Sequence, residues 1–135
     1  MKQIAFAAAA VAGMFIAMGS ASAQDAADVK AGEKSFAKCR ACHQVGPTAK
    51  NVVGPKLNGL FGRTAGTVEG YNYSAANKNS KIEWTEESFA KYITNPRAFM
   101  PGNKMAFAGI KSEKEIRDLT AFLKQFDNDG KKSGS

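Results

Sequence analysis

The stretch Cys39-Arg40-Ala41-Cys42-His43 decides the fold of this 135-residue chain, because it contains both cysteines and the only histidine. One histidine and two cysteines are too few for a structural zinc site, which takes four nitrogen or sulfur ligands. A chain of this length supports a single compact domain. Its net charge of +7 and ordinary apolar content indicate a globular protein with a basic surface rather than a disordered chain.

The spacing C-x-x-C-H is typical of covalent attachment of a c-type haem. Cys39 and Cys42, three positions apart at a helix end, present both thiols to one side, where they can add to the two vinyl groups of the haem. The adjacent His43 then places an imidazole nitrogen against the iron. Two other interpretations compete, a single disulfide in an exported protein and a thioredoxin-like redox dithiol. The dithiol requires alternating strands and helices that the surrounding sequence lacks, and the disulfide leaves His43 without a role.

The N-terminal residues predict a secretory signal peptide over residues 1–23, with residues 24–135 as the domain of the mature chain. An uncharged apolar run from Ile4 to Gly19 follows a positively charged start, and Ala21 and Ala23 satisfy the small-residue rule for cleavage. A membrane anchor is the alternative, but the run is shorter than the roughly 20 residues that span a bilayer. Because cleavage removes one lysine, the net charge falls from +7 to +6. We therefore expect a periplasmic protein that does not span the membrane once processed.

The sixth coordination position of the iron has few candidate ligands in this chain. Since His43 is the only histidine, a second imidazole is excluded, and the thioether of Met100 or Met105 remains. Pro96 and the Pro-Gly pair at 101–102 predict a loop without regular helix in this region. Met105 follows that turn, where a loop can deliver its sulfur across from His43. Met100 is expected to fill the core, as methionines usually do.

The rest of the sequence predicts an all-α protein. The first helix is expected over residues 30–42, with Gly32 and Phe36 on one face. The second starts after the N-cap Thr85 and ends near Asn95, because a proline follows.

A third helix opens with a capping box from Ser112 to Glu115. Its apolar face is formed by Ile116, Leu119, Leu123 and Phe126. The glycine-rich stretch over residues 46–70 is predicted to be mostly loop, which needs a ligand to organise it. A buried haem would supply that missing core.

Several motifs occur together in a fixed order along the chain. In that order they are Gly32–Phe36, the C-x-x-C-H segment, Gly54–Arg63, Gly70–Asn77, Trp84 and Asn95–Ile110. With these motifs the chain resembles the class I cytochromes c, close to the mitochondrial type and its small bacterial relatives, over about residues 28–126. The resemblance implies a class I cytochrome c fold with one covalent haem c, in which the first and last helices cross at Gly32.

The resemblance also implies a function and a set of residues around the haem. The protein would be a one-electron carrier, not an enzyme, between a membrane cytochrome complex and a terminal oxidase, reductase or photosynthetic reaction centre. His43 and Met105 would be the axial ligands, and the carbonyl of Pro55 would accept a hydrogen bond from the second ring nitrogen of His43. The others would bind or surround the haem: Cys39 and Cys42 covalently, Tyr73, Trp84 and Arg63 near a propionate, and Asn77 and Tyr92 near the methionine side.

Each of these supporting residues also has a purely structural interpretation. Trp84 and Tyr92 could be core aromatic residues, Arg63 a solvated charge and Asn77 a turn or cap residue. Two departures from the family pattern stand out: Asn103 replaces a threonine that many relatives carry two positions before the methionine, and Ala98 replaces a lysine of the mitochondrial type. A haem sensor or peroxidase-like protein with a labile sixth ligand is the alternative function.

A basic docking surface is expected around the exposed haem edge. Such charge steers a monomeric carrier into transient complexes with acidic, membrane-bound redox partners, and the effect weakens as salt rises. A merely solvated charged face is the alternative, and no nucleic-acid-binding module is present in the sequence. The residues expected on this surface are Lys38, Lys56, Arg97, Lys104 and Lys111.

Overall fold

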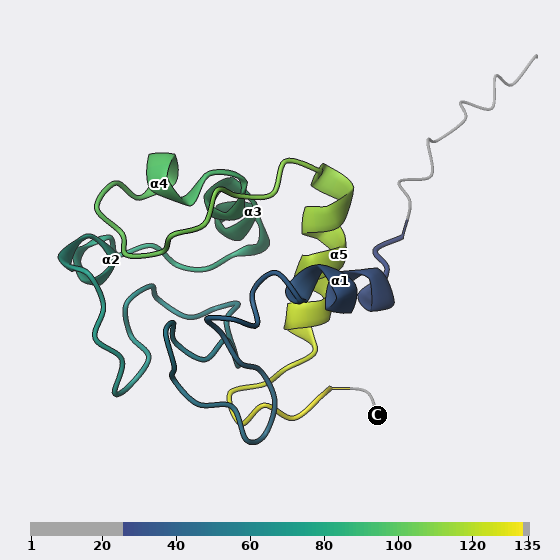
Figure 1. The fold of residues 1–135 in the computed structure, drawn as a ribbon. Helices are drawn as coiled ribbons and strands as arrows, with labels where there is room; N and C mark the ends of the chain where they lie inside the picture. The colour runs from purple at the N-terminus through teal and green to yellow at the C-terminus, as the bar shows by residue number, and fades with distance from the viewer. Residues whose placement is uncertain (1–25, 134–135) are drawn as a thin grey trace, which may run out of the picture.

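Helices and connecting loops make up residues 26–133, which are the residues that the computed structural model describes. The helices in this part are α1 (Val29–Phe36), α2 (Ala75–Asn79), α3 (Glu86–Thr94), α4 (Pro96–Phe99) and α5 (Glu113–Lys124) (Figure 1). Beside them, the same residues form only two isolated β-bridges, so the prediction of an all-α fold is confirmed. None of these helices is long and apolar enough to cross a membrane. The predicted signal peptide lies outside the described residues.

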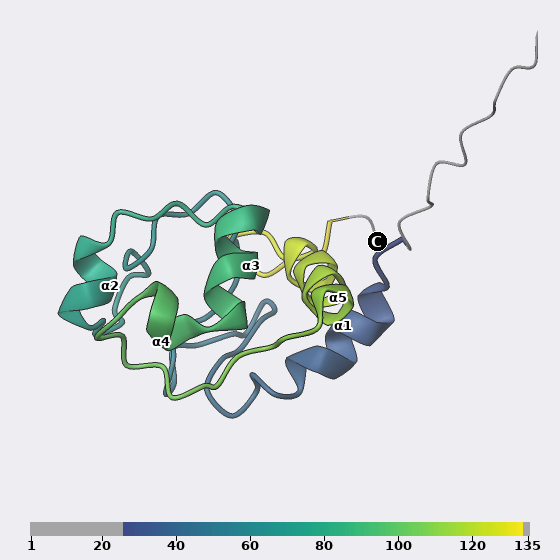
Figure 2. The ribbon, with the colours of Figure 1, turned by 90° about the horizontal axis from the view of Figure 1, so that it is seen from above.

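Helices α1 and α5 are distant in sequence but cross in direct contact (Figures 1 and 2). Gly32 lies at the crossing, where a Cβ atom would stand 1.9 Å from the carbonyl oxygen of Asp118 and 2.8 Å from Cβ of Phe122. The rings of Phe36 and Phe122 pack beside this point with centroids 5.4 Å apart. Any side chain at position 32 would therefore separate the helices, and the predicted crossing at this glycine is confirmed.

The two crossing helices are also joined by polar contacts through Glu115. Its carboxylate accepts hydrogen bonds from Oγ of Ser35 at 2.6 Å and from Nζ of Lys38 at 2.5 Å, and these contacts lower its pKa. The backbone N–H of Glu115 donates to Oγ of the N-cap Ser112 at 3.3 Å. Only this half of the predicted capping box is therefore formed, because the glutamate side chain is bound to α1 instead.

Helix α1 is shorter than the sequence predicts. It ends at Phe36, and residues 37–42 continue as tight turns rather than as regular helix. The N–H of Cys39 donates to the carbonyl of Phe36 at 2.8 Å, and the N–H of Cys42 donates to the carbonyl of Cys39 at 3.0 Å. These bonds span three residues instead of four, which tightens the chain relative to an α-helix. The expected helix over residues 30–42 is thus wrong for its second half, and both cysteines lie on turns.

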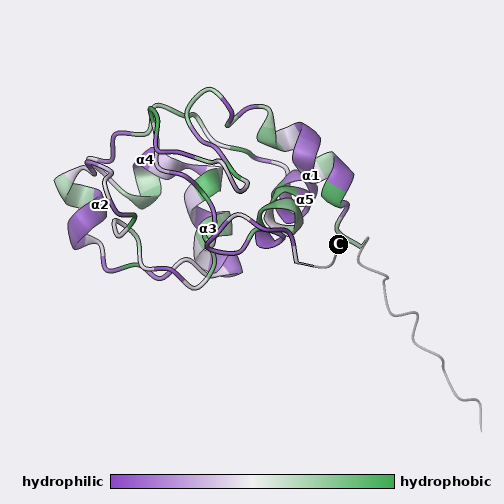
Figure 3. Ribbon diagram, turned by 90° about the horizontal axis from the view of Figure 1, so that it is seen from below, coloured by the Kyte–Doolittle hydropathy of each residue, from purple (hydrophilic) through white to green (hydrophobic). Residues whose placement is uncertain are grey.

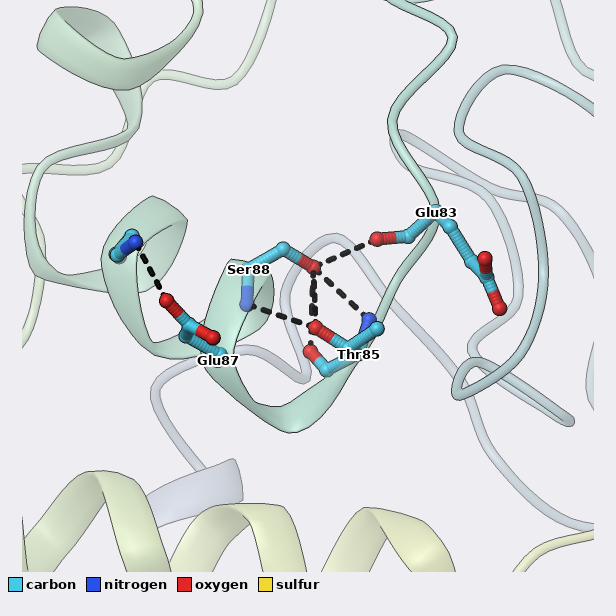
Figure 4. Close-up of polar contacts among 5 residues, drawn as sticks. Glu83, Thr85, Glu87 and Ser88 are labelled. Carbon is cyan, nitrogen blue, oxygen red and sulfur yellow. Dashed lines mark hydrogen bonds and ion pairs between the residues drawn. The ribbon is translucent and has the colours of Figure 1, made fainter.

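The start of α3 follows the prediction and adds a contact that was not expected. Thr85 is the N-cap, and its Oγ1 accepts from the N–H of Ser88 at 3.1 Å. Oγ of Ser88 in turn accepts from the N–H of Thr85 at 2.9 Å and donates to the carbonyl of Glu83 at 2.7 Å (Figure 4). A serine thus closes the capping box here, so the box is formed without the usual glutamate or glutamine.

Helix α4 contradicts the prediction that the region after Asn95 contains no regular helix. Pro96 occupies the first helical position, where its missing N–H would have had no partner in any case. Oδ1 of Asn95 caps this single turn by accepting from the N–H of Ala98 at 3.2 Å. The loop character returns after Met100, at the Pro-Gly pair.

The buried core lies where α5 meets α1 and α3. Both α1 and α5 carry hydrophilic and hydrophobic residues in alternation along their length (Figure 3). The predicted apolar face of α5 is buried, with Leu119 and Leu123 each 1% exposed, and Phe126 is buried just after the helix end. Residues 46–70 form no helix, as predicted.

Candidate functional site

A cavity of about 560 Å³ lies between the helices and the long loop region. This volume is typical of a site for an organic ligand. Much of its wall is apolar, with side chains from the loops, α3 and α5, among them Leu57, Leu60, Phe89, Ile93, Leu119 and Leu123. Every residue that the sequence assigned to the haem lies on this wall: Cys39, Cys42, His43, Pro55, Arg63, Tyr73, Asn77, Trp84, Tyr92 and Met105.

Cys39 and Cys42 reach the cavity from the tight turns that follow α1. They are half-buried and not bonded to one another. Burial raises the pKa of the Cys39 thiol to about 11, so this thiol stays protonated at neutral pH. Cys39 is therefore not poised as a reactive thiol, which would require a lowered pKa.

His43 is held in one orientation by the loop that packs against it. Its Nδ1 lies 2.7 Å from the carbonyl oxygen of Pro55. Because a carbonyl can only accept, Nδ1 carries the proton and Nε2 keeps its lone pair. Burial lowers the pKa of the ring, which favours the neutral form that binds metals. Gly54 packs closely against the ring, because a Cβ atom at position 54 would stand 2.4 Å from Cε1 of His43.

Met105 lies on the same cavity and receives a hydrogen bond at its sulfur. The hydroxyl of Tyr92 donates to Sδ of Met105 at 3.4 Å. Burial raises the pKa of Tyr92 to about 12, so the phenol keeps its proton and remains a donor. Trp84 packs on Tyr92 with ring centroids 5.0 Å apart and fixes its position. Met100 is 4% exposed and does not line the cavity, so the two methionines have different surroundings.

Polar side chains gather on another part of the wall. Nη1 of Arg63 donates to the carbonyl of Asn58 at 3.0 Å, and the hydroxyl of Tyr73 accepts from the N–H of Val68 at 3.2 Å. Burial lowers the pKa of Arg63 and raises that of Tyr73, which keeps its proton. Oδ1 of Asn77 is buried with no hydrogen-bond partner within residues 26–133. A buried unpaired acceptor on a cavity wall indicates that a bound molecule or water completes the site.

The donor set fits a haem better than any other cofactor. Two thiols, a neutral imidazole and a thioether surround one cavity, and these are the groups that hold and ligate a c-type haem. The apolar walls suit the porphyrin, and Arg63 and Tyr73 offer polar contacts at its edge. The residues present therefore fit the group that the sequence predicted.

The five residues of the expected docking surface are spread over several segments. Lys38 and Lys104 line the cavity, but both donate within the protein, Lys38 to Glu115 and Lys104 to the carbonyl of Asn72 at 2.6 Å. Lys111 donates in the same way to a backbone carbonyl. Among residues 26–133, the side chains of Lys56, which is half-buried, and Arg97, which is exposed, make no such contact.

Two residues of the site gave little signal in the sequence. Gly54 stands next to Pro55 in the motif, but its contact with His43 depends on how the loop folds back. Asn103 appeared only as a departure from the family pattern, yet it lies on the cavity wall. Neither position could be predicted from the spacing of residues, because each depends on how a loop folds back onto the cavity.

A helical shell that closes around an apolar cavity, with a C-x-x-C-H segment on its wall, is the architecture of a class I c-type cytochrome. The family model described as "Cytochrome c" matches residues 29–127, and the chain belongs to the cytochrome c family. The predictions of a covalently bound c-type haem, and of an electron carrier rather than an enzyme, are thereby confirmed at the level of the family.

Relatives of known name agree with this assignment. Cytochrome c2 of Blastochloris viridis is 54% identical over 122 residues, which is 90% of this chain and 96% of that protein. Cytochrome c-550 of Nitrobacter winogradskyi is 58% identical over 77% of this chain and 95% of its own length. The solved structure of cytochrome c2 from Rhodospirillum centenum superposes with a TM-score of 0.71 at 41% identity, covering 74% of this chain and 98% of that one.

Proposed function

We propose that the chain is a periplasmic one-electron shuttle in which Cys39 and Cys42 hold the haem and His43 and Met105 ligate its iron. The observation that carries this proposal is the shared cavity, with the two thiols and the imidazole on its wall together with the sulfur of Met105, to which Tyr92 donates. When bound, the haem supplies a reversible one-electron couple. His43 and Met105 would both ligate the iron, so oxygen and other small molecules would find no open position.

The residues around the two ligands tune this couple. A thioether ligand favours the ferrous state and raises the reduction potential. The bond between His43 and Pro55 fixes the ring and increases its basicity as a ligand. The apolar side chains on the cavity wall would limit the access of water to the bound haem.

We further propose that the protein is exported by the signal peptide over residues 1–23 and acts as a monomer. Its donor would be a membrane cytochrome complex, and its acceptor a terminal oxidase, a reductase or a photosynthetic reaction centre. Names of relatives such as cytochrome c2 and cytochrome c-550 support a carrier of this kind.

Basic residues near the cavity mouth would dock the carrier on acidic partners. Lys38 and Lys104 lie on the cavity wall, whereas Lys56, Arg97 and Lys111 lie outside it. Electron-transfer rates with a membrane partner should fall as ionic strength rises, because salt screens this attraction. Rates that do not change with salt would reject the basic docking surface.

The axial ligand is tested by removing one sulfur at a time at constant volume. Met105→Leu should allow the reduced protein to bind carbon monoxide at neutral pH and should lower the reduction potential. Met100→Leu is the matched control, since leucine replaces methionine in a core at small cost, and it should change neither property.

Carbon monoxide also separates the shuttle from the alternative function. The native reduced protein should not bind it, because both axial positions are filled. Rapid, stoichiometric binding by the native protein would instead favour a haem sensor or peroxidase-like protein. Effects that follow Met100→Leu and not Met105→Leu would show that the ligand is misassigned.

A further inference from the structure

The side chain of Asn103 lies within the loop that delivers Met105 and bonds to three of its backbone groups. Its Nδ2 donates to the carbonyl of Pro96 at 2.9 Å and to the carbonyl of Met100 at 2.7 Å. Its Oδ1 accepts from the N–H of Met105 at 2.8 Å. Both amide protons and the amide oxygen are thus used within residues 96–105.

We propose that Asn103 is a positioning residue that keeps the sulfur of Met105 in its ligand position. This inference rests on the proposed function, because it takes Met105 as the axial ligand. The amide binds the main chain of Met105, while the hydroxyl of Tyr92 donates to its sulfur at 3.4 Å. Met105 is therefore held at both ends, by one side chain from its own loop and one from α3.

The loop has no regular hydrogen-bond ladder, so individual contacts must fix it. Away from Asn103 these include the bond from Nζ of Lys104 to the carbonyl of Asn72 and the bond from the N–H of Ile110 to the carbonyl of Ile93. Residues 103–112 form no helix or strand, and Gly102 before them adopts a φ of +86°. A segment of this kind opens locally at low free energy unless side chains bind it. The bonds from Asn103 connect it to Pro96 and Met100, which belong to or adjoin α4 and are buried. The amide of Asn103 thus connects Met105 to the buried residues of the α4 region.

The same contacts determine what Asn103 does not do. Both of its amide protons are engaged with the carbonyl oxygens of Pro96 and Met100, so neither is left to donate toward a bound haem. A threonine at this position has a single hydroxyl proton and could make only one of these two donor contacts. In this chain the residue therefore acts on Met105 from within the loop.

The test is the rate of carbon monoxide binding to the reduced, haem-loaded protein at neutral pH. Asn103→Ala should raise this rate at least tenfold and lower the reduction potential, because the open state of the loop becomes more populated. A tenfold change corresponds to about 1.4 kcal/mol, which lies within the net contribution of one or two hydrogen bonds. Asn103→Asp keeps the size and the acceptor but lacks both N–H donors, and it should act in the same direction.

Asn51 provides a matched control. It is also a loop asparagine with two backbone contacts, donating to the carbonyl of Glu69 at 2.9 Å and accepting from the N–H of Lys56 at 3.0 Å. Asn51→Ala should lower the melting temperature but leave the carbon monoxide rate and the potential unchanged. An equal rise in rate for Asn51→Ala, or native rates for Asn103→Ala or Asn103→Asp, would overturn the inference.

Met105→Leu distinguishes failure of this inference from failure of the proposed function. If Met105→Leu opens the iron to carbon monoxide but Asn103→Ala does not, only the positioning role is wrong. If Met105→Leu leaves binding unchanged, Met105 is not the ligand and both proposals fall.

Discussion

Replacement of Gly54 by alanine measures how tightly the protein holds the imidazole of His43. A Cβ atom at this position would stand 2.4 Å from Cε1, 2.7 Å from Nδ1 and 2.9 Å from Nε2 of the ring, whereas ordinary contact begins at 3.4 Å. The ring or the loop must therefore move by about 1 Å. Gly54 is not among the glycines with positive φ, so alanine causes no backbone strain. The effect of the substitution comes from the contact with the ring alone.

The size of the effect follows from two contributions. Overpacking of a buried site costs about 1–3 kcal/mol. Displacement of the ring also weakens its hydrogen bond to Pro55, worth about 0.5–1.5 kcal/mol. Together they predict a loss of about 2–4 kcal/mol, which lowers the melting temperature of a domain of this size by about 10 °C or more. Since the ring is the proposed iron ligand, its displacement should also weaken the bond between His43 and the iron and so change the haem spectrum.

The assay is thermal unfolding of the haem-loaded protein. Far-ultraviolet circular dichroism gives the melting temperature, and haem absorbance gives the spectrum. Gly62→Ala is the control, because Gly62 has a φ of +91° and a Cβ atom there would meet nothing within 4 Å. The control should lose about 1–2 kcal/mol through backbone strain and keep a native haem spectrum. Gly54→Ala should change both the melting temperature and the spectrum. Native values of both for Gly54→Ala would refute a tight fit between the loop and the ring.

Two further predictions concern the crossing of α1 and α5. Gly32→Ala should lower the free energy of unfolding by about 2 kcal/mol. Its Cβ atom would stand 1.9 Å from a backbone oxygen of Asp118, so overpacking should reach the upper end of about 1–3 kcal/mol and exceed the roughly 1 kcal/mol gained in helix propensity. In urea titrations the exposed Lys34→Ala should stay within about 0.5 kcal/mol of the native protein, and an unchanged midpoint for Gly32→Ala would contradict the close crossing. The ion pair with Lys114 at 2.8 Å lowers the pKa of Asp118 below the unfolded value of about 3.9. Its stabilisation is therefore complete above that pH and is lost as the pH falls through the folded-state pKa. Asp118→Asn should be less stable at neutral pH but approach the native urea midpoint in acid, and a constant difference at all pH values would contradict this role.

Local chemistry explains which parts of the fold could be predicted from the sequence. Helices α3 and α5 form where expected. Their signals act within one segment each: the N-cap Thr85 and the proline after Asn95 for α3, and the apolar spacing for α5. The half of the capping box that does not form at α5 depends on a contact between segments. The side chain of Glu115 leaves its capping position because it accepts hydrogen bonds from Ser35 on α1 and from Lys38 on the turn that follows α1.

The candidate site shows the same division. The thiols and the imidazole lie within five consecutive residues, so their chemistry was evident from spacing alone. The conformation of the segment before Met105 was harder to predict, because proline can either break a helix or start one. The short helix at Pro96 forms because Asn95 caps it. The role of Asn103 could not be predicted, since the sequence does not say whether an amide points into its own loop or toward the cavity.

Different contacts fix the His43 side and the Met105 side of the cavity, and this difference indicates which side should open first. On one side, His43 makes a hydrogen bond to the carbonyl of Pro55 and packs closely against Gly54, and it lies next to both cysteines in the chain. On the other, Met105 depends on hydrogen bonds from two side chains to a segment without regular structure. Hydrogen bonds of this kind contribute about 1 kcal/mol each, whereas covalent attachment to a haem does not break reversibly. If Met105 is the ligand, as proposed, ligand loss and the fall in reduction potential that accompanies it should therefore begin at the methionine loop.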